Sequence, residues 1–245
     1  MSDPIILIPA RLKATRLPNK PLADIHGLPM IVHVWKRAME AGIGPVVVAA
    51  AEPQIADAVT KAGGQAVLTD PDLPSGSDRV WAALNIVDPK GRHDVVVNLQ
   101  GDLPAIDPQV IAAVLTPLND PEVDIATLVA PIRSSEELEN PNVVKAALAF
   151  APQASVARAL YFSRVPVPWG EGLHWHHIGI YAYRRQALTR FVDLPVGLLE
   201  AREKLEQLRA LENGMRIDAA RVDTVPDGVD TPADLERARA LLAKS

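Results

Sequence analysis

Four basic side chains follow directly after the first apolar run of the chain. Residues 4–10 are apolar and rich in isoleucine, which predicts a buried strand that ends near Pro9. The basic residues lie in the connection after this strand, and they are Arg11, Lys13, Arg16 and Lys20. Ligands of an open α/β sheet bind beyond the carboxyl ends of its strands, so this connection is well placed to hold a polyanion such as a nucleoside triphosphate. The alternative interpretation is a solvated charged loop.

This connection does not follow the common phosphate-binding patterns. The spacing Gly-x4-Gly-Lys-Ser/Thr is absent, and no Gly-x-Gly-x-x-Gly follows the strand. We therefore expect side-chain cations to provide more of the phosphate binding than backbone amides do.

The same connection resembles the signature loop of the 3-deoxy-manno-octulosonate cytidylyltransferases. The matching residues are 8–11, 15–18 and 20–22, with Thr15 among them. Four further blocks match in family order: Ser75-Gly76-Ser77-Asp78-Arg79, Asn98-Leu99-Gln100-Gly101-Asp102, Tyr161-Phe162-Ser163-Arg164 with His177-Ile178-Gly179-Ile180-Tyr181, and Leu205-Glu206-Gln207-Leu208-Arg209 with Val229-Asp230-Thr231-Pro232. Together the five blocks span nearly the whole chain.

The resemblance implies a fold and an activity. The fold would be α/β, a Rossmann-like three-layer nucleotide-diphospho-sugar transferase fold with a mostly parallel, twisted sheet. The whole chain, 1–245, would form one nucleotidyltransferase domain, with a smaller inserted subdomain at about residues 130–200 for sugar binding and homodimer contact. The activity would be a CMP-sugar synthetase for lipopolysaccharide biosynthesis, which makes CMP-octulosonate and pyrophosphate from CTP and 3-deoxy-manno-octulosonate with Mg²⁺.

Nucleotidyl transfer depends on placing the α-phosphorus in line with an attacking oxygen and on spreading the triphosphate charge over cations. We assign Arg11, Arg16 and Lys20 to the triphosphate as catalytic residues, because guanidinium forks match paired phosphate oxygens. Lys13 is the most dispensable of the four, because the family motif does not require a base at its position and a solvated lysine is the favoured interpretation. The wider nucleotide site is expected to include Pro9, Ala10, Ser75, Gly76, Arg79 and Gln100.

Asp102 follows the apolar strand 94–99, which places a carboxylate at the carboxyl edge of the sheet. Mg²⁺ takes one or two carboxylates and completes its shell with water and phosphate oxygens. The resemblance places Asp230 opposite Asp102 as the second metal ligand. On the sequence alone, Asp230 would rather stabilise the dipole of the helix that begins after it.

The sugar acid carries a carboxylate and several hydroxyls, so its pocket needs a cation and neutral hydrogen-bonding groups. The residues expected there are Arg164, Gln100, His177, Tyr181, Glu206 and Gln207. Arg164 would pair with the carboxylate, and the others would orient hydroxyls. His174, His176 and His177 crowd together, but adjacent residues of a strand face opposite ways, so a transition-metal site is disfavoured.

Two positions depart from the family pattern. Leu103 stands where an acidic residue often follows the Gly-Asp pair, and Ala50-Ala51 stand where a polar pair often ends the second strand. These changes leave open a different sugar acid, such as a modified octulosonate. The nearest rival is a cytidylyltransferase for a nonulosonate such as sialic acid, and the blocks 161–164 and 177–181 argue against it. The alternative from another class is a non-catalytic nucleotide-binding protein of the same fold.

Composition narrows the class of protein. The chain has 245 residues, 48% of them hydrophobic, so it can bury a sizeable core. Its net charge of −5 disfavours nucleic acid or an anionic membrane as a partner. It has no cysteine, and its first apolar run is too short for a signal peptide or a membrane span. We therefore expect a soluble cytoplasmic protein.

Alternating patterns predict the elements that position these residues. Strands are expected at 46–50, 66–68, 94–99 and 125–129, and helices at 31–38, 55–62, 77–87 and 108–118. From residue 130 the alternation loosens, with strands expected at 143–150, 159–162 and 178–183. A helix at 200–213, a strand at 217–222 and a helix capped by Thr231 complete the chain.

Overall fold

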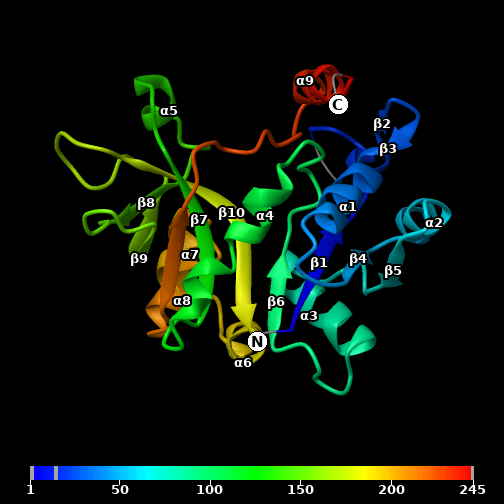
Figure 1. Ribbon diagram of the computed structural model, residues 1–245, viewed down its shortest axis with the longest axis horizontal. Coiled ribbons are helices and arrows are strands. Elements are labelled where there is room, and N and C mark those ends of the chain that lie inside the picture. Colours follow the sequence, from blue (N-terminus) through cyan, green and yellow to red (C-terminus); the bar gives the residue numbers. More distant parts are fainter. Residues whose placement is uncertain (1–2, 14–15, 244–245) are drawn as a thin grey trace. The chain divides into compact units, whose positions relative to one another are not determined.

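The computed structural model describes residues 3–13 and 16–243 (Figure 1). Thr15, which belongs to the predicted signature loop, lies outside the described residues. The chain divides into two compact units, the first formed by residues 1–112 and 226–245 and the second by residues 113–225. The second unit therefore extends beyond the 130–200 segment expected from the sequence.

The first unit contains a four-stranded parallel sheet. Its strands are β1 (Pro4–Ala10), β4 (Val46–Ala50), β5 (Gln65–Leu68) and β6 (Val95–Asn98), arranged in the order β5-β4-β1-β6. Leu7 of β1 is in register with Val47 of β4 on one side and with Asn98 of β6 on the other. The central strand is buried along its length, because helices cover both faces of such a sheet.

The strand order of this unit reverses beside β1. The chain first runs outward from β1 through α1 (Met30–Glu40), β4 and α2 (Pro53–Lys61) to β5. It then returns through α3 (Gly76–Val87) to β6 on the opposite side of β1. The carboxyl ends of β1 and β6 therefore form a topological switch point, the usual place for a ligand in an open α/β sheet.

The end of the chain belongs to the first unit. Helix α9 (Pro232–Leu242) packs Leu235 and Ala238 into a small core with Ile25, Met30 and Val229. Ile25 comes from a short hairpin formed by β2 (Asp24–Ile25) and β3 (Leu28–Pro29). This core anchors the segment before α9, which carries Asp230.

The second unit contains a mixed sheet that curls until its ends pair. Its strands are β7 (Ile125–Pro131), β8 (Lys145–Leu148), β9 (Val156–Ser163), β10 (Trp175–Arg184) and β11 (Ile217–Arg221). They are arranged in the order β10-β7-β11-β9-β8, and β8 also pairs with β10 through Lys145 and His176. Among these pairs only β7 and β11 are parallel. The expectation of a mostly parallel sheet is therefore met in the first unit and is wrong for the second.

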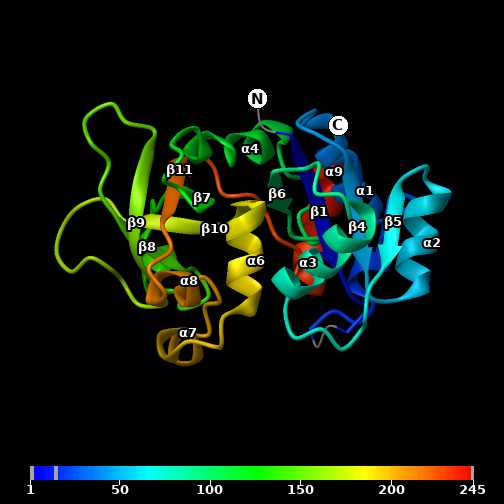
Figure 2. The same cartoon turned by 90° about the horizontal axis from the view of Figure 1, so that it is seen from below.

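Helices and short turns complete the two units, and Figure 2 shows them from a second direction. The remaining elements are η1 (Lys20–Leu22), α4 (Pro108–Ala113), η2 (Thr116–Asn119), α5 (Ser135–Glu139), α6 (Arg185–Asp193), α7 (Leu198–Glu203) and α8 (Leu208–Glu212). Within the described residues, no helix has the length and apolar character needed to cross a membrane.

Two predicted helices are interrupted. The helix expected at 108–118 ends at Ala113, because Pro117 lacks a backbone N–H and disfavours helical geometry in the residue before it. The helix expected at 200–213 is split into α7 and α8. Lys204 adopts left-handed geometry, with φ of 59°, and ends the first of them.

Candidate functional site

Residues 17–22, in the last part of the connection after β1, form a tight turn that presents Lys20. Asn19 adopts left-handed geometry with φ of 56°, which asparagine tolerates better than most residues. The backbone N–H of Lys20 donates to the carbonyl of Leu17 at 3.2 Å, and that of Leu22 donates to the carbonyl of Asn19 at 2.8 Å. The turn therefore fixes the backbone from which the Lys20 side chain extends.

Asp102 lies at the switch point because the segment after β6 packs tightly against β1. A Cβ atom at Gly101 would lie 2.9 Å from the carbonyl oxygen of Pro9, so only glycine fits there without a shift. The carbonyl of Asp102 accepts a hydrogen bond of 2.9 Å from the N–H of Val229. This bond ties the segment that carries Asp102 to the segment that carries Asp230.

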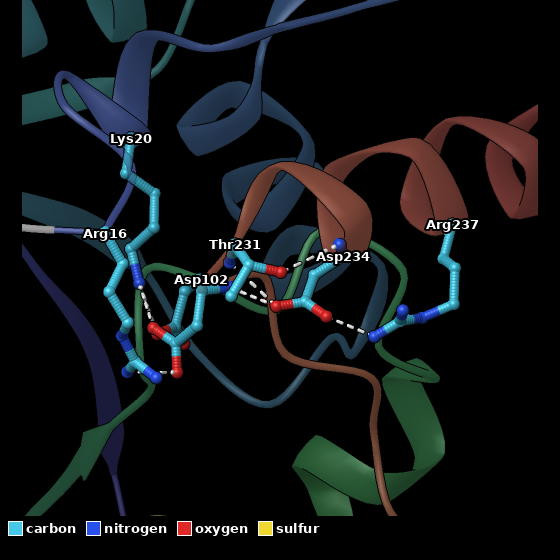
Figure 3. Close-up of polar contacts among 7 residues, drawn as sticks. Arg16, Lys20, Asp102, Thr231, Asp234 and Arg237 are labelled. Atoms are coloured by element: carbon cyan, nitrogen blue, oxygen red, sulfur yellow. Dashed lines mark hydrogen bonds and ion pairs between the residues drawn. The ribbon is translucent and has the colours of Figure 1, made fainter.

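The Lys20 ammonium bridges two carboxylates (Figure 3). Its Nζ lies 2.9 Å from Oδ2 of Asp102 and 3.0 Å from Oδ1 of Asp230. Burial alone would lower the pKa of Lys20, but the two carboxylates raise that pKa above its ordinary value. Lys20 therefore stays charged, and the carboxylates are held close together.

Asp230 is held by the beginning of helix α9. The Asp234 carboxylate accepts hydrogen bonds from the N–H groups of Asp230 at 3.0 Å and Thr231 at 2.7 Å, while the Thr231 hydroxyl accepts from the N–H of Asp234. Arg237 forms an ion pair with Asp234 (Figure 3). Burial would raise the pKa of Asp234, but these hydrogen bonds lower it on balance. The capping box predicted from Thr231 therefore also fixes the backbone of Asp230.

The other two predicted catalytic cations are more exposed. Arg16 Nη2 lies 3.0 Å from Oδ2 of Asp230, and 62% of its side chain is exposed. Arg11 is exposed and has no hydrogen-bond or ion-pair partner among the residues that the structure describes. Both guanidinium groups are thus accessible to an added anion. We call Arg11, Arg16, Lys20, Asp102 and Asp230 the ionic cluster.

A cavity of about 590 Å³ contains the whole ionic cluster. Its other lining residues are Pro9, Ala10, Lys13, Leu17, Pro21, Gln100 and Gly101. A smaller cavity of about 170 Å³ is lined by Pro9, Ala10, Arg11, Ser75, Gly76, Arg79 and Gln100. Every residue predicted to bind nucleotide lines at least one of these cavities.

The donor set of the ionic cluster fits a hard divalent cation. Asp102 and Asp230 each place one carboxylate oxygen within 3.0 Å of the Lys20 nitrogen, so the two carboxylates lie close enough together to share a cation. Two carboxylates and several water or phosphate oxygens are the usual shell of Mg²⁺. Among the described residues, no group of three or more acidic or histidine side chains forms a complete metal site.

Arg79 has a structural task as well as a place in the smaller cavity. It is buried, and its guanidinium donates to the Thr69 hydroxyl at 2.7 Å and to the carbonyls of Asp70 and Pro71. Burial lowers its pKa, and the nearby charge of Arg11 lowers it further. Ser75 caps α3, since its hydroxyl accepts from the N–H of Asp78 at 3.1 Å.

The positions that depart from the family pattern carry no charge and little exposed surface. Ala50 and Ala51 are buried at the end of β4, where the Ala51 N–H donates to the carbonyl of Ala10. Leu103 is 8% exposed, and its Cδ2 lies 3.8 Å from the site of a Cβ at Gly228. In this protein Leu103 therefore supports the segment before Val229 by packing.

Residues predicted for the sugar gather in the second unit. The rings of His177 and Tyr181 lie 5.5 Å apart, and the pKa of Tyr181 is raised by burial and by Tyr183 and Glu206. Gln207 is 6% exposed, and its amide nitrogen is buried without a hydrogen-bond partner in the part of the chain described. We call His177, Tyr181, Glu206 and Gln207 the buried polar cluster; His177 and Gln207 are buried in it, and Tyr181 and the acidic Glu206 are partly buried. Gln100, the remaining neutral candidate, belongs to the first unit.

His177 is buried and neutral. Burial lowers its pKa to about 3, with a smaller contribution from His176. Its Nε2 lies 3.0 Å from the hydroxyl of Thr127, a fully buried residue of β7 that the sequence analysis did not identify. The sequence signal that could have identified Thr127 is its position as a polar residue within the apolar run 125–129.

The Arg164 guanidinium is largely engaged within its own unit. It donates to the carbonyls of Glu203 at 2.7 Å, Pro141 at 3.0 Å and Lys204 at 3.2 Å. These bonds use three of its five N–H groups, and its guanidinium forms no ion pair within the described residues, while the Glu203 carboxylate accepts from its backbone N–H at 3.1 Å.

The three crowded histidines contact different partners. His174 is bonded to the carbonyl of Pro168 at 2.9 Å, and His176 pairs with Glu137 at 2.7 Å. His177 instead contacts Thr127. Their rings therefore serve three separate contacts.

Comparisons with known proteins agree on one family. Residues 5–217 match the family model described as cytidylyltransferase. The 3-deoxy-manno-octulosonate cytidylyltransferase of Paramagnetospirillum magneticum is 68% identical over 98% of this chain and 97% of its own. That of Methylobacterium radiotolerans is 69% identical over 99% of this chain and 98% of its own. A solved CMP:2-keto-3-deoxy-manno-octonic acid synthetase in complex with CTP has 41% identity and a TM-score of 0.90, with 99% of both chains covered.

Proposed function

The chain belongs to the cytidylyltransferase family, and we propose that it transfers CMP from CTP to the anomeric hydroxyl of 3-deoxy-manno-octulosonate and releases pyrophosphate, a step of lipopolysaccharide biosynthesis. The observation that carries this proposal is the ionic cluster, whose cations and paired carboxylates share one cavity at the switch point of the sheet. The product forms when the anomeric oxygen bonds to the α-phosphorus, the bond to pyrophosphate breaks, and the hydroxyl proton is released.

Arg11, Arg16 and Lys20 hold the triphosphate and stabilise the departing pyrophosphate. Arg11 and Arg16 suit this task because their guanidinium groups are exposed and can each bind two phosphate oxygens. Lys20 is more buried, so its charge acts at a fixed point between the carboxylates and the phosphates. The main contribution of these residues is charge placed in advance where charge develops during transfer.

Asp102 and Asp230 would hold Mg²⁺ together with phosphate oxygens. When bound, the ion supplies positive charge that neutralises the triphosphate. The two carboxylates are held for this purpose by the Val229 bond to Asp102 and by the Asp234 bonds to the backbone at Asp230.

The buried polar cluster binds the sugar acid in this proposal. Its neutral imidazole, phenol and amide groups suit the hydroxyls of a sugar, and the positive charge of Arg164 suits its carboxylate. The amide nitrogen of Gln207 supports a ligand role, because a buried donor without a partner destabilises the protein unless something binds it.

We also propose a homodimer formed through the second unit, in the cytoplasm. Leu160, Val165 and Leu173 are more than half exposed, and Trp169 is 99% exposed. Exposed apolar residues of this size are typical of protein interfaces. Sedimentation of the wild type and of Trp169→Ser tests this contact, and a monomeric wild type would contradict it.

Pyrophosphate release with Mg²⁺ tests the activity. We expect release with CTP and 3-deoxy-manno-octulosonate, and little release when UTP, ATP or GTP replaces CTP. Release with CTP and sialic acid, but none with the octulosonate, would contradict the assignment of the sugar. No release with any of these pairs would indicate a nucleotide-binding protein without turnover.

A further inference from the structure

Thr127 lies beside an irregularity of β10. It is fully buried on β7 and is in register with Tyr181. The register of β10 shifts between Ile178 and Tyr181, which leaves Gly179 and Ile180 as a bulge. At this bulge the carbonyl oxygens of Ile178 and Ile180 lie 3.1 Å and 2.9 Å from the Thr127 hydroxyl oxygen.

The same hydroxyl oxygen also contacts an imidazole nitrogen. His177 Nε2 lies 3.0 Å from Thr127 Oγ1. A hydroxyl has one hydrogen to donate and lone pairs to accept, whereas a carbonyl oxygen can only accept. Two oxygens 2.9 Å apart need a hydrogen between them, so the hydroxyl hydrogen belongs to the carbonyls. Thr127 therefore accepts from His177, and the imidazole hydrogen is on Nε2.

The second imidazole nitrogen must then carry a lone pair. His177 is 7% exposed, its ring packs against Phe162 with ring centres 4.7 Å apart, and burial keeps the ring neutral. A neutral imidazole has one N–H, so Nδ1 is an acceptor. Among the described residues, Nδ1 has no hydrogen-bond partner.

We propose that Thr127 is a positioning residue that fixes His177 in the Nε2–H tautomer, so that Nδ1 accepts a hydrogen bond from a hydroxyl of the sugar acid. This inference rests on the proposed function, which assigns His177 to the sugar. A buried acceptor discriminates strongly against a ligand that lacks the matching donor, because the acceptor is then left unpaired. Thr127 thus acts on specificity without touching the substrate.

Nitrogen NMR of the full chain, labelled with ¹⁵N-histidine, tests the tautomer directly. His177→Gln identifies the His177 signals. We expect the Nε2–H pattern in the wild type and in Thr127→Ser, which keeps the hydroxyl. Thr127→Val has a similar shape but no hydroxyl, so nothing fixes the tautomer. In this variant we expect the signals of His177 to depart from the pure Nε2–H pattern. An Nδ1–H pattern in the wild type would overturn the inference even if Thr127→Val does not fold.

Steady-state kinetics test the consequence for the sugar. We expect Thr127→Val to raise KM for 3-deoxy-manno-octulosonate about tenfold, the factor for one lost hydrogen bond, with KM for CTP unchanged. Thr127→Ser should behave as the wild type. An unchanged sugar KM in Thr127→Val, together with a lost tautomer, would overturn the role in specificity. Absence of turnover in the wild type would overturn the proposed function and the sugar role, while the spectrum still decides the tautomer.

Discussion

The ionic cluster and the buried polar cluster differ in the exposure and the charge of the side chains proposed to bind their ligands. In the ionic cluster, the exposed fractions of the side chains are 62% for Arg16, 49% for Asp230, 31% for Asp102 and 17% for Lys20. In the buried polar cluster, His177 and Gln207 are 7% and 6% exposed, and His177 is neutral. The ionic cluster therefore keeps full charges near water, whereas His177 and Gln207 of the buried polar cluster are neutral groups shielded from it.

This difference follows from the ligands proposed for each unit. A triphosphate carries several charges, so exposed guanidinium groups can bind its oxygens in more than one pairing. A sugar hydroxyl carries no charge, and only a dry, fixed partner distinguishes it from water. Substitutions in the ionic cluster should therefore lower turnover, because they remove charge. Substitutions in the buried polar cluster should change the selectivity for the sugar acid, because they change the geometry of its partners.

The largest effect is expected at Asp102. Asp102→Asn removes one of the two carboxylates proposed to hold Mg²⁺, and turnover should fall roughly 10³-fold, the scale for losing one strong electrostatic contribution. Circular dichroism should show an unchanged fold. Asp107→Asn serves as the matched control, because the Asp107 side chain is exposed and accepts a backbone N–H of Gln109, which an asparagine oxygen can also accept. Full activity of Asp102→Asn would contradict the metal assignment.

Lys20 and Arg16 are both cations of the ionic cluster, but Lys20 is the more buried, so substituting each one tests how burial changes the contribution of a cation to stability. Lys20→Met leaves Asp102 and Asp230 close together without their shared cation, so we expect a loss of about 2 kcal/mol in unfolding free energy and roughly 10²-fold in turnover. Arg16→Gln changes a more exposed side chain, and its stability should stay within about 0.5 kcal/mol of the wild type. Urea unfolding measures the stability of each variant, and pyrophosphate release measures its turnover. Equal losses of unfolding free energy in the two variants would contradict the prediction that the more buried cation contributes more to stability.

The pH dependence of stability tests the neutral state of His177. Its pKa is about 3 in the folded protein and near 6.5 when unfolded, so the unfolded chain binds the extra proton first as pH falls. The stability from this residue is present above pH 6.5 and is lost below it, by about 2 kcal/mol at pH 5. Urea titrations at pH 5 and above pH 6.5 measure the free energy of unfolding. The difference between these two conditions should be smaller in His177→Gln than in the wild type. An identical difference in both proteins would indicate that His177 titrates normally.

The smallest effect is expected at Asp234, which contacts Asp230 through the backbone. Asp234→Ala removes a helix cap, for a loss of about 1 kcal/mol in unfolding free energy. It should also raise the Mg²⁺ concentration for half-maximal activity about tenfold, because Asp230 loses a backbone restraint. Thr231→Ala removes the hydroxyl part of the same cap but keeps the bond from Asp234 to the Asp230 N–H. If both variants shift the Mg²⁺ dependence equally, Asp234 acts only through helix stability.

Much of the first unit could be predicted from the sequence. The apolar runs 4–10 and 46–50 match β1 and β4, because a parallel strand buried on both faces must be continuously apolar. The cations after β1 and the carboxylate after β6 could be placed at one sheet edge by the same reasoning. In the second unit the pattern is weaker, because its sheet is mixed and closes on itself, and α5 and α6 were not predicted.

The sequence by itself determined which chemical groups follow which strands, since periodicity and turn residues act over a few positions. Only the tertiary structure decided their partners. Lys20 meets Asp230 across 210 residues of chain, and Thr127 meets His177 across 50. Such contacts depend on strand order, on the bulge of β10 and on the packing of α9. These features arise from the burial of the whole core, so they leave no local signal in the sequence.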